Sequence, residues 1–564
     1  MHTYGVPKED PMEQVDVLVV GGGTVGLAAA AFLAKHRVRP LVAERHAGPN
    51  VHPRATGVAI RTVEMLRELG AEQALNELAV DLSGAFGKTS ARTVRDLDPA
   101  ELPAHRAVRR AMTEEAGAIS PSRLRGTCAQ DRLDTVLLDQ VTRRGVEVRY
   151  GTELLALHQA PDHVTGTLRG PAGEGKVEAR YVVAADGAGS TVRRLLGIPV
   201  SGPGPLGDEL ANILFEADLA PLLGDRRFAL CQITHPDAPG LVVAIDGERR
   251  WVFHTSAAAP DAGPEECRVL VRTALGDPDV DVKVVSTLRW RPQSRLADRF
   301  RDGRVFLAGD AAHTISALGA FGMNTGVADA HNLAWKLAHV LQGRAGAPLL
   351  DTYEQERRPV AATTVDQALL RLSHPDLHWD RGPGTASRRA AVGMLNAPVV
   401  ILGYRYTSTA VRGTQPVLPS TEDIAANLDG SPGTRVPHVW LTKDRPTTED
   451  GQADRLSTLD LVAGRWTLLA GPDGETTPAG GAGPAGTTWP EAGAEAARRA
   501  GTELACYRVG VDVEDPEGRF PAAAGISPDG ALLVRPDGFV GWRSPTAAGA
   551  PDLPAVLANL IGCG

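Results

Sequence analysis

Three glycine-rich turns, far apart in the chain, carry the residue types that bind a dinucleotide. Gly21, Gly23 and Gly26 form a Gly-x-Gly-x-x-Gly turn between the apolar run Val15–Val20 and an Ala-rich segment. The first glycine permits a tight turn, the second lets backbone approach a pyrophosphate, and the third permits close packing of helix on strand. The pattern predicts phosphates at the positive end of the following helix. A glycine-rich turn without a ligand is the alternative.

An acidic residue follows the first turn at the spacing expected for contact with a ribose. Glu44 ends a second apolar strand that begins at Pro40, and its carboxylate can accept hydrogen bonds from a ribose diol. Its negative charge also repels a 2′-phosphate, so the site is predicted to hold FAD or NAD rather than NADP. The neighbouring Arg45 is a further candidate for cofactor contact.

The second and third turns each place an aspartate after a buried strand. Asp186 follows the run 181–185, and Asp310 follows the run 305–308. Asp186 has two interpretations, as a cofactor ligand or as the cap of the next helix. Asp310 is predicted to serve the ribityl chain or the pyrophosphate region, because a buried carboxylate needs hydrogen-bonding partners.

A predicted helix begins shortly after the third turn, at Gly322, Met323 and Asn324. Backbone N–H groups at a helix start can hydrogen-bond a flavin pyrimidine and stabilise negative charge there. Together with the three turns, this helix start favours a flavoprotein over a protein with a single dinucleotide loop.

The elements that must position these residues change in character along the chain. Strands alternate with helices from about 14 to 200, which predicts an α/β, Rossmann-like fold. Five alternating strands between about 205 and 295 predict an inserted antiparallel sheet, and long helices follow at 324–341 and 349–366. The predicted domains are an FAD-binding domain in two parts (1–200 and 299–410, the second with the long helices), a substrate-binding sheet domain (201–298) and a C-terminal domain (411–564).

Composition limits the class of protein. The 564 residues carry a formal net charge of −9, which argues against a nucleic-acid partner. The five cysteines are scattered and form no Cys-x-x-Cys pair, so a metal or dithiol site is not expected and a cytoplasmic location is. The N-terminus lacks the apolar stretch of a signal peptide, and no run of 18 apolar residues predicts a membrane span.

These motifs resemble those of the class A flavin-dependent aromatic hydroxylases, the para-hydroxybenzoate hydroxylase family, over nearly the whole chain. Within that family, the closest resemblance is to actinobacterial hydroxylases of polycyclic aromatic polyketides. The resemblance implies that Arg54 meets the FAD pyrophosphate and that Gln130 contacts FAD. The segments that carry it, besides the three turns, are 52–55, 61–64, 129–133, 186–193, 212–215 and 321–326.

Three late stretches, 402–406, 433–438 and 533–538, resemble the longer members of the family, which have a thioredoxin-like C-terminal domain. That domain contains Cys506 but no Cys-x-x-Cys pair, so redox activity is not expected of it. The resemblance implies a structural or oligomer-contact role for this domain, with a homodimer as the assembly to test.

The resemblance also implies an activity: a monooxygenase that holds FAD, consumes NADH or NADPH and O2, and hydroxylates a polycyclic phenol through a flavin C4a-hydroperoxide. Alternatives on the same fold are Baeyer–Villiger insertion and oxidative decarboxylation or rearrangement. A non-catalytic flavin- or ligand-binding protein is the alternative from another class. The catalytic residues are not predicted: His254 and His235 lie in the predicted sheet, where a lone histidine is more often a packed or surface residue.

The inserted sheet is predicted to supply a floor for a flat substrate, since stacking contributes about 0.5–1.5 kcal/mol per aromatic contact. An ordinary sheet core is the competing interpretation for each side chain. The loop 316–322 is the other candidate, because it has Ala317 and Ala320 where the family usually has Pro and Gly. The candidate substrate residues are Phe228, Leu230, Gln232, Trp251, Phe253, Trp290, Ala317 and Leu318.

Overall fold

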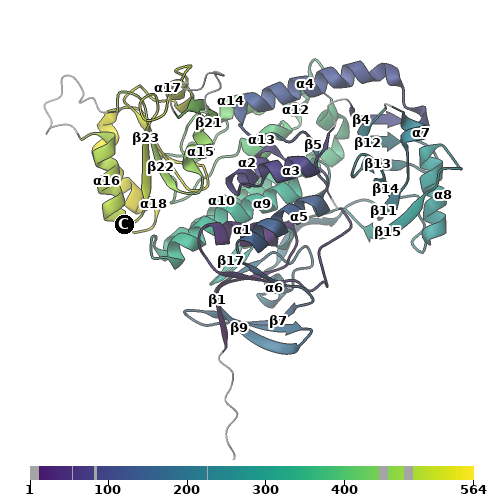
Figure 1. Ribbon diagram of the computed structural model, residues 1–564, viewed down its shortest axis with the longest axis horizontal. Helices are drawn as coiled ribbons and strands as arrows, with labels where there is room; N and C mark the ends of the chain where they lie inside the picture. The colour runs from purple at the N-terminus through teal and green to yellow at the C-terminus, as the bar shows by residue number, and fades with distance from the viewer. Residues whose placement is uncertain are drawn as a thin grey trace, which may run out of the picture.

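The computed structural model describes residues 12–53, 55–81, 85–224, 226–380, 382–443, 455–474 and 487–563. Figure 1 shows three regions: a mainly parallel sheet with helices, a second sheet beside α5 (Gln130–Arg143) and α8 (Pro264–Leu275), and a C-terminal region on the opposite side. In these ranges, no helix is long and apolar enough to cross a bilayer.

The parallel sheet forms the dinucleotide-binding part of the fold. Its order is β17-β18-β9-β1-β2-β6, and the neighbours from β18 to β6 run parallel. Val17–Val20 of β1 are almost fully buried, as expected for a central parallel strand that is covered on both faces. The strands are β1 (Glu13–Val20), β2 (Pro40–Ala43), β6 (Glu147–Arg149), β9 (Gly173–Ala184), β17 (Arg301–Asp302) and β18 (Val305–Leu307).

Helices α1 (Thr24–Lys35), α5 and α9 (Phe321–Leu341) pack with this sheet in one apolar core. A hairpin of β7 (Glu153–Gln159) and β8 (Val164–Gly170) extends the sheet antiparallel to β9. The predicted α/β architecture is confirmed. The predicted helix 324–341 agrees with α9 to within three residues, whereas α10, predicted as 349–366, continues to Ser373.

A second, six-stranded sheet has the order β15-β11-β14-β13-β12-β4. All its pairs are antiparallel except β12 with β4, which run parallel. The inserted sheet is therefore present, with one strand supplied by the first part of the chain. The strands are β4 (Phe86–Ala91), β11 (Leu210–Glu216), β12 (Phe228–Ile233), β13 (Gly240–Ala244), β14 (Arg250–Thr255) and β15 (Lys283–Trp290).

The two faces of this second sheet have different neighbours. The outer face packs with α8 in one core, in which Cys267 and Val271 lie beside Trp251 and Phe253. The inner face meets the FAD-binding region through Val252, which lies in a cluster with Ala129 at the start of α5. In Figure 1 the sheet accordingly lies between α8 and α5. Side chains on the inner face are thus the ones placed toward the flavin region.

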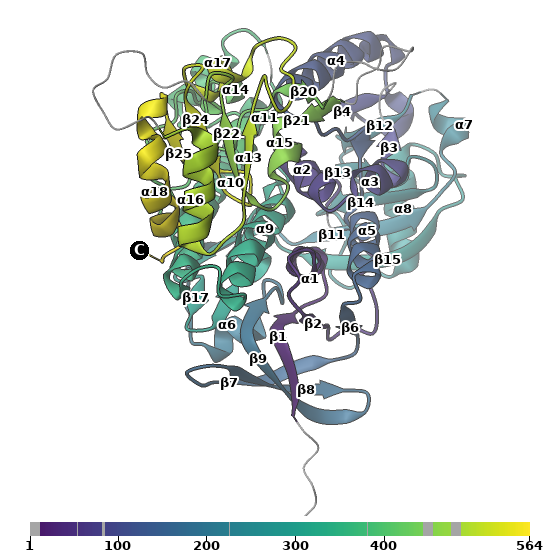
Figure 2. The same ribbon diagram turned by 60° about the vertical axis from the view of Figure 1, so that its left-hand side comes forward.

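The C-terminal region contains a four-stranded sheet of order β23-β22-β24-β25, parallel only between β22 and β23. Cys506 on β23 is half-buried beside Gly493, and the described cysteines are all free. The elements are β22 (Trp466–Ala470), β23 (Leu504–Arg508), β24 (Ala531–Val534), β25 (Val540–Ser544), α16 (Trp489–Ala500) and α18 (Leu553–Leu560). Figure 2 shows this region packed beside α9 and α10 (Asp351–Ser373).

A buried ion cluster joins the C-terminal region to α9 and α10. Arg535 contacts Glu356 of α10 at 2.6 Å and Asp537 at 2.5 Å, and Lys336 of α9 contacts Glu356 at 2.7 Å. These four side chains are at most 1 % exposed. Because an isolated buried charge is costly, each member depends on the others for compensation.

Helix α4 (Leu102–Ile119) has no counterpart among the predicted elements. Ile119 is its one buried residue, and the rest of the helix is largely solvent-facing. Its Ala- and Arg-rich sequence gives helix propensity without the apolar stripe that would predict a packed helix. In Figure 1 it runs along the edge of the molecule between the C-terminal region and β4.

Candidate flavin site and substrate face

The first glycine turn has the geometry that a bound pyrophosphate needs. Gly21 has φ of 106°, and a Cβ there would lie 2.4 Å from the carbonyl oxygen of Ala185. A Cβ at Gly26 would lie 1.8 Å from the carbonyl oxygen of Gly21. A Cβ at Gly23 would meet nothing within 4 Å, so this glycine borders open space at the start of α1. The first helical N–H groups point into that space without intrahelical acceptors.

Glu44 supports the same turn. Its Oε2 accepts a hydrogen bond from the backbone N–H of Gly22 at 2.6 Å, and its Oε1 accepts one from that of His46 at 2.8 Å. Burial raises the pKa of Glu44, but these N–H groups and the His46 ring outweigh burial and lower the net pKa. The carboxylate is therefore charged at neutral pH, as a ribose acceptor should be. Arg45 is exposed, and the predicted contact of Arg54 lies outside the described residues.

Gln130 lies where the family resemblance predicts a cofactor contact. Its Nε2 donates to the hydroxyl of Thr24, the first residue of α1, at 2.9 Å. The Thr24 hydroxyl in turn donates to the buried carboxylate of Asp134. This chain of hydrogen bonds fixes the start of α5 against the start of α1, so Gln130 is held beside the space that Gly23 borders.

The second turn favours the capping interpretation of Asp186. One oxygen of Asp186 accepts a hydrogen bond from the Ser190 hydroxyl at 2.5 Å, and the other accepts from the Val192 N–H at 3.0 Å. Arg193 donates to the carbonyl oxygens of Ala188 and Ala311 at 2.9 and 2.7 Å. That guanidinium ties the second turn to the third, a role that the sequence pattern did not reveal.

Asp310 differs from the prediction in one respect. It was predicted to be a buried carboxylate, but its side chain is exposed. The strand β18 and Ala308 before it are fully buried, and the chain turns outward at Gly309, which has φ of 59°. The carboxylate therefore needs no compensation for burial, and its role toward FAD stays a prediction.

The start of α9 is held by Asn324. Its Oδ1 accepts from the Ala59 N–H at 2.8 Å and the Thr62 hydroxyl at 2.7 Å, and its Nδ2 donates to the carbonyls of Gly57 and Ala320. The side-chain amide of Asn324 thus forms its hydrogen bonds with other groups of the protein. The predicted flavin contacts of this segment fall to the first N–H groups of the helix, which include those of Gly322 and Met323.

The residue before α9, Ala320, has φ of 54° in the left-handed region. Glycine adopts this conformation without strain, so the change from the family's glycine leaves a strained alanine at the entry of the helix. Ala317 is exposed and Leu318 is half-buried, just before this position. Their predicted contact with substrate remains a prediction.

A buried aspartate on α9 holds the third turn. Asp329 accepts hydrogen bonds from the Gly309 N–H at 3.1 Å, from His313 Nε2 at 2.6 Å and from Arg357 Nε at 2.7 Å. Burial raises the pKa of Asp329, but His313 and Arg357 outweigh it and lower the net pKa. The sequence analysis missed this residue, because a polar residue within a long helix carries no local signal of a remote partner.

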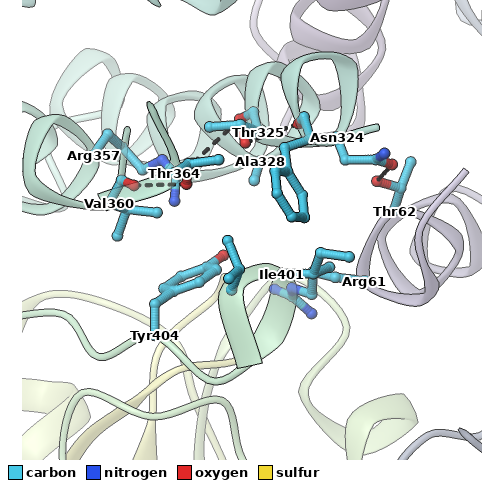
Figure 3. A pocket seen from close by; sticks show the side chains of 12 residues that line it. Arg61, Thr62, Asn324, Thr325, Ala328, Arg357, Val360, Thr364, Ile401 and Tyr404 are labelled. Atoms are coloured by element: carbon cyan, nitrogen blue, oxygen red, sulfur yellow. Dashed lines mark hydrogen bonds between the residues drawn. The ribbon is translucent and has the colours of Figure 1, made fainter. Parts of the chain in front are cut away.

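A small cavity lies beside the first turns of α9 (Figure 3). Its volume of about 20 Å³ suits a single water molecule and excludes an aromatic substrate. Figure 3 shows side chains from α2 (Ile60–Glu68), α9, α10 and α13 (Ala397–Leu402) around it. Arg61 lines this cavity, and its Nε has no hydrogen-bond partner among the described residues. The substrate must therefore bind elsewhere.

The predicted substrate floor divides between the two faces of the second sheet. Phe228, Trp251 and Phe253 are at most 2 % exposed and lie in the outer core with α8. They form the ordinary sheet core that was the competing interpretation. Alternation along β14 places Trp251 and Phe253 on the face opposite Val252, and Phe228 joins this core through its contact with Trp251. Leu230 and Gln232 lie on the inner face and stay partly exposed, opposite Val243 and Leu241.

Trp290 also lies on the inner face, on β15, and is half-buried. Pairing of β11 with β15 places Trp290 opposite Leu210 and Ser286 opposite the inner-face Leu214. The His52 ring bridges this face to the flavin region, with Nδ1 2.6 Å from the Ser286 hydroxyl and Nε2 2.8 Å from Asn212 Oδ1. The segment after His52 reaches the start of α9 through Asn324, so one short segment connects the two sites.

Comparison with known proteins identifies this arrangement. Residues 14–368 match the FAD binding domain family, and residues 429–563 match the family of the aromatic-ring hydroxylase C-terminal domain. The chain belongs to the FAD-dependent aromatic-ring hydroxylases. It is 38 % identical to the tetracenomycin A2 monooxygenase-dioxygenase of Streptomyces glaucescens, over 94 % of both chains. It is 37 % identical to the aklavinone 12-hydroxylase of Streptomyces purpurascens, over 97 % of this chain and 99 % of the relative.

A solved relative supports the same assignment. The crystal structure of aklavinone-11 hydroxylase with FAD and aklavinone superposes with a TM-score of 0.83 at 36 % identity, over 98 % of this chain and 100 % of that one. The hydroxylase is therefore an FAD-dependent monooxygenase that takes electrons from NAD(P)H and an oxygen atom from O2. Bound FAD supplies the redox chemistry, and the residues described above are the candidates for binding it and for shaping the space beside it.

Proposed function

We propose that this hydroxylase oxygenates a phenol ring of a polycyclic, polyketide-type aromatic molecule. The proposed binding place is the inner face of the six-stranded sheet. The observation that carries the proposal is that the His52 segment joins this face directly to the start of α9, where flavin contacts are expected. The relatives act on, or are named for, tetracenomycin A2 and aklavinone, which supports a fused-ring substrate.

In this proposal the chain's own residues have separate tasks. The first turn and Glu44 bind the dinucleotide, while Asp329 and Arg193 hold the third turn in place. The start of α9 supplies N–H groups and the positive end of a helix to an anionic ring. The inner face orients the flat substrate and excludes water from the space beside the flavin.

The test is product mass spectrometry under ¹⁸O2, with FAD-loaded enzyme and a panel that includes aklavinone and tetracenomycin A2. NADH and NADPH are compared as electron donors. We expect substrate-stimulated NAD(P)H oxidation and a product that gains ¹⁸O from O2 while its carbon skeleton is unchanged. Reactions with H2¹⁸O and ¹⁶O2 serve as the control, and should give no label.

Other outcomes would select the alternatives. A ring-expanded lactone would indicate Baeyer–Villiger insertion, and loss of CO2 would indicate oxidative decarboxylation. A product that gains two labelled oxygen atoms would indicate a reaction like that of the monooxygenase-dioxygenase relatives. Bound flavin without NAD(P)H oxidation for any member of the panel would contradict the proposal and favour a ligand-binding protein.

A further inference from the structure

Two aromatic residues on the inner face of the six-stranded sheet have no role in the fold that accounts for their polar atoms. His254 lies on β14 and Trp290 on β15, and both are half-buried. Their rings meet edge to face, with centroids 6.4 Å apart and an interplanar angle of 77°. Both side chains point to the same side of the sheet as Val252, which packs toward α5.

Neither ring nitrogen at this contact has a protein partner. His254 Nδ1 and Trp290 Nε1 are both buried, and neither forms a hydrogen bond within the described ranges. Most buried polar atoms in native proteins are paired, because an unpaired one loses its hydration without replacement. Two such atoms on adjacent strands, at one contact, are therefore unusual in a place that structure alone would fill with apolar side chains.

The neighbouring His52, on the same face, differs from His254 because both of its ring nitrogens have hydrogen-bond partners. Asn212 Oδ1 can only accept, so His52 Nε2 carries the proton and Nδ1 accepts from the Ser286 hydroxyl. Burial, followed by the nearby His52, lowers the pKa of His254 to about 4. His254 is therefore neutral near pH 7 and offers one hydrogen-bond donor and one acceptor, while Trp290 offers a donor only.

We propose that His254 and Trp290 form a recognition pair for oxygen atoms on the edge of the fused aromatic substrate. The imidazole accepts a hydrogen bond from a phenolic hydroxyl, and the indole N–H donates to the same oxygen or to a carbonyl oxygen beside it. Both rings are partly exposed on the inner face, and in the proposed complex each ring rotates about its χ2 torsion to bring its nitrogen atom to the substrate oxygen. The inference rests on the proposed function, since it places the substrate on this face.

The pair acts in specificity and positioning, because it selects molecules that carry oxygen on this edge and fixes which ring lies near the flavin. A site built to hydrogen-bond a hydroxyl discriminates strongly against an analogue without it, since the buried polar groups are then left unpaired. No covalent step is assigned to either residue.

The test compares two flat probes that differ in one hydrogen-bond donor. The FAD-loaded enzyme is titrated calorimetrically with 2-hydroxyanthraquinone and with 2-methoxyanthraquinone, whose ether cannot donate. We expect the wild type to bind the phenol at least about tenfold more tightly than the ether, the equivalent of one hydrogen bond. His254→Leu should abolish that ratio, and His254→Gln should restore part of it because its amide can accept. Trp290→Phe should weaken the binding of both probes and leave the ratio in place, because the ether oxygen also accepts from the indole N–H.

His235→Leu is the matched control. His235 lies in the same sheet region, but its Nδ1 accepts from the Asp237 N–H at 3.2 Å and it borders an open groove on the outer side beside α8. It should leave the ratio unchanged. FAD content and melting temperature are measured for every variant.

Several results would overturn the inference. If the wild type binds the phenol and the ether equally well, or binds neither, the pair does not recognise a hydroxyl group. A ratio that persists in His254→Leu would exclude His254, and loss of FAD in both His254 variants would show a structural role. The ¹⁸O experiment decides the proposed function separately, because it depends on turnover and not on this ratio.

Discussion

The glycine turns and the inner face of the six-stranded sheet differ in what the protein leaves for a ligand. At the turns, polar side chains such as Glu44 and Asn324 form hydrogen bonds with the backbone of the protein. Space for a ligand is left beside Gly23, which has no side chain. On the inner face, space is not reserved by glycine, and His254 and Trp290 keep polar atoms without partners. The candidate cofactor site is thus shaped by the backbone, whereas the proposed substrate face carries side-chain atoms without partners.

The largest effect should follow from closing the space at Gly23. In Gly23→Val, FAD affinity should fall by about 100-fold or more, because the side chain occupies the place of the pyrophosphate. The fold should survive, since a Cβ at Gly23 meets nothing within 4 Å. Fluorescence titration of apoprotein with FAD measures the affinity. Gly26→Ala is the contrast: it should destabilise the apoprotein itself, because its Cβ would lie 1.8 Å from a backbone oxygen. Normal FAD affinity in Gly23→Val would refute the assignment of the turn.

The contrast between the two sheet faces should appear in stability. Phe253→Ala on the outer face should destabilise the protein by about 3–5 kcal/mol, the usual loss for a fully buried phenylalanine. Leu230→Ala on the partly exposed inner face should cost about 1 kcal/mol or less, and should instead weaken substrate binding. Denaturant midpoints and substrate KM values check the pair. Equal stability losses would mean that the inner face is as much a core as the outer one.

Acid should destabilise the protein through its buried neutral histidines. Burial lowers the pKa of His36 to about 3 and those of His254, His339 and His438 to about 4. The unfolded chain binds protons near pH 6.5 and the folded chain does not, so stability is full above pH 6.5 and falls as pH drops toward 4. Each such histidine adds up to about 1.4 kcal/mol per pH unit to the slope.

In His254→Gln and in His438→Gln, unfolding between pH 6.5 and 4.5 should take up about one proton fewer than in the wild type. The slope of stability against pH should be smaller by the corresponding amount. The free energy of unfolding is measured by denaturant titration at several pH values. His235→Gln, beside the outer groove, is the comparison variant for a histidine-to-glutamine change elsewhere in the same sheet region. If His254→Gln had no effect on the slope, the neutral, buried state assigned to His254 would be wrong.

The smallest effect is a gain. Ala320→Gly should stabilise the holoprotein by about 1 kcal/mol, because glycine adopts the left-handed conformation at φ of 54° without strain. Ala330→Gly, within α9, should lose about 1 kcal/mol or more. Thermal melts of the two variants compare them directly. A destabilised Ala320→Gly protein would show that the Ala320 methyl has packing value that outweighs the strain.

The flavin site could be largely predicted from sequence because its signals are local. Three glycines with different roles lie within six residues: Gly21 makes the turn, Gly23 leaves space for a ligand, and Gly26 lets the helix pack on the strand. Glu44 follows at the end of the next strand. The same locality left two interpretations open at Asp186 and implied a buried Asp310, whose side chain is exposed. Whether a carboxylate after a strand binds a ligand, caps a helix or faces solvent depends on the turn beyond it.

The substrate face could be predicted only in part. Alternation of apolar residues shows that a strand has two faces, but it does not show which face turns toward the rest of the chain. Phe228, Trp251 and Phe253 were therefore placed with Leu230, although α8 covers them. The long-range contacts of Asp329 and His52 have no sequence signal at all, since their partners lie on other elements.

The ion cluster of Lys336, Glu356, Arg535 and Asp537 has a consequence for engineering. Exchanging the C-terminal region between relatives at residue 411 would separate Arg535 and Asp537 from Lys336 and Glu356. A chimera whose donor region lacked matching charges would bury a lone carboxylate or ammonium inside the molecule. A chimera must therefore take all four residues from the same parent. A junction at residue 411, although it separates two domains predicted from the sequence, divides the cluster and should destabilise the chimera.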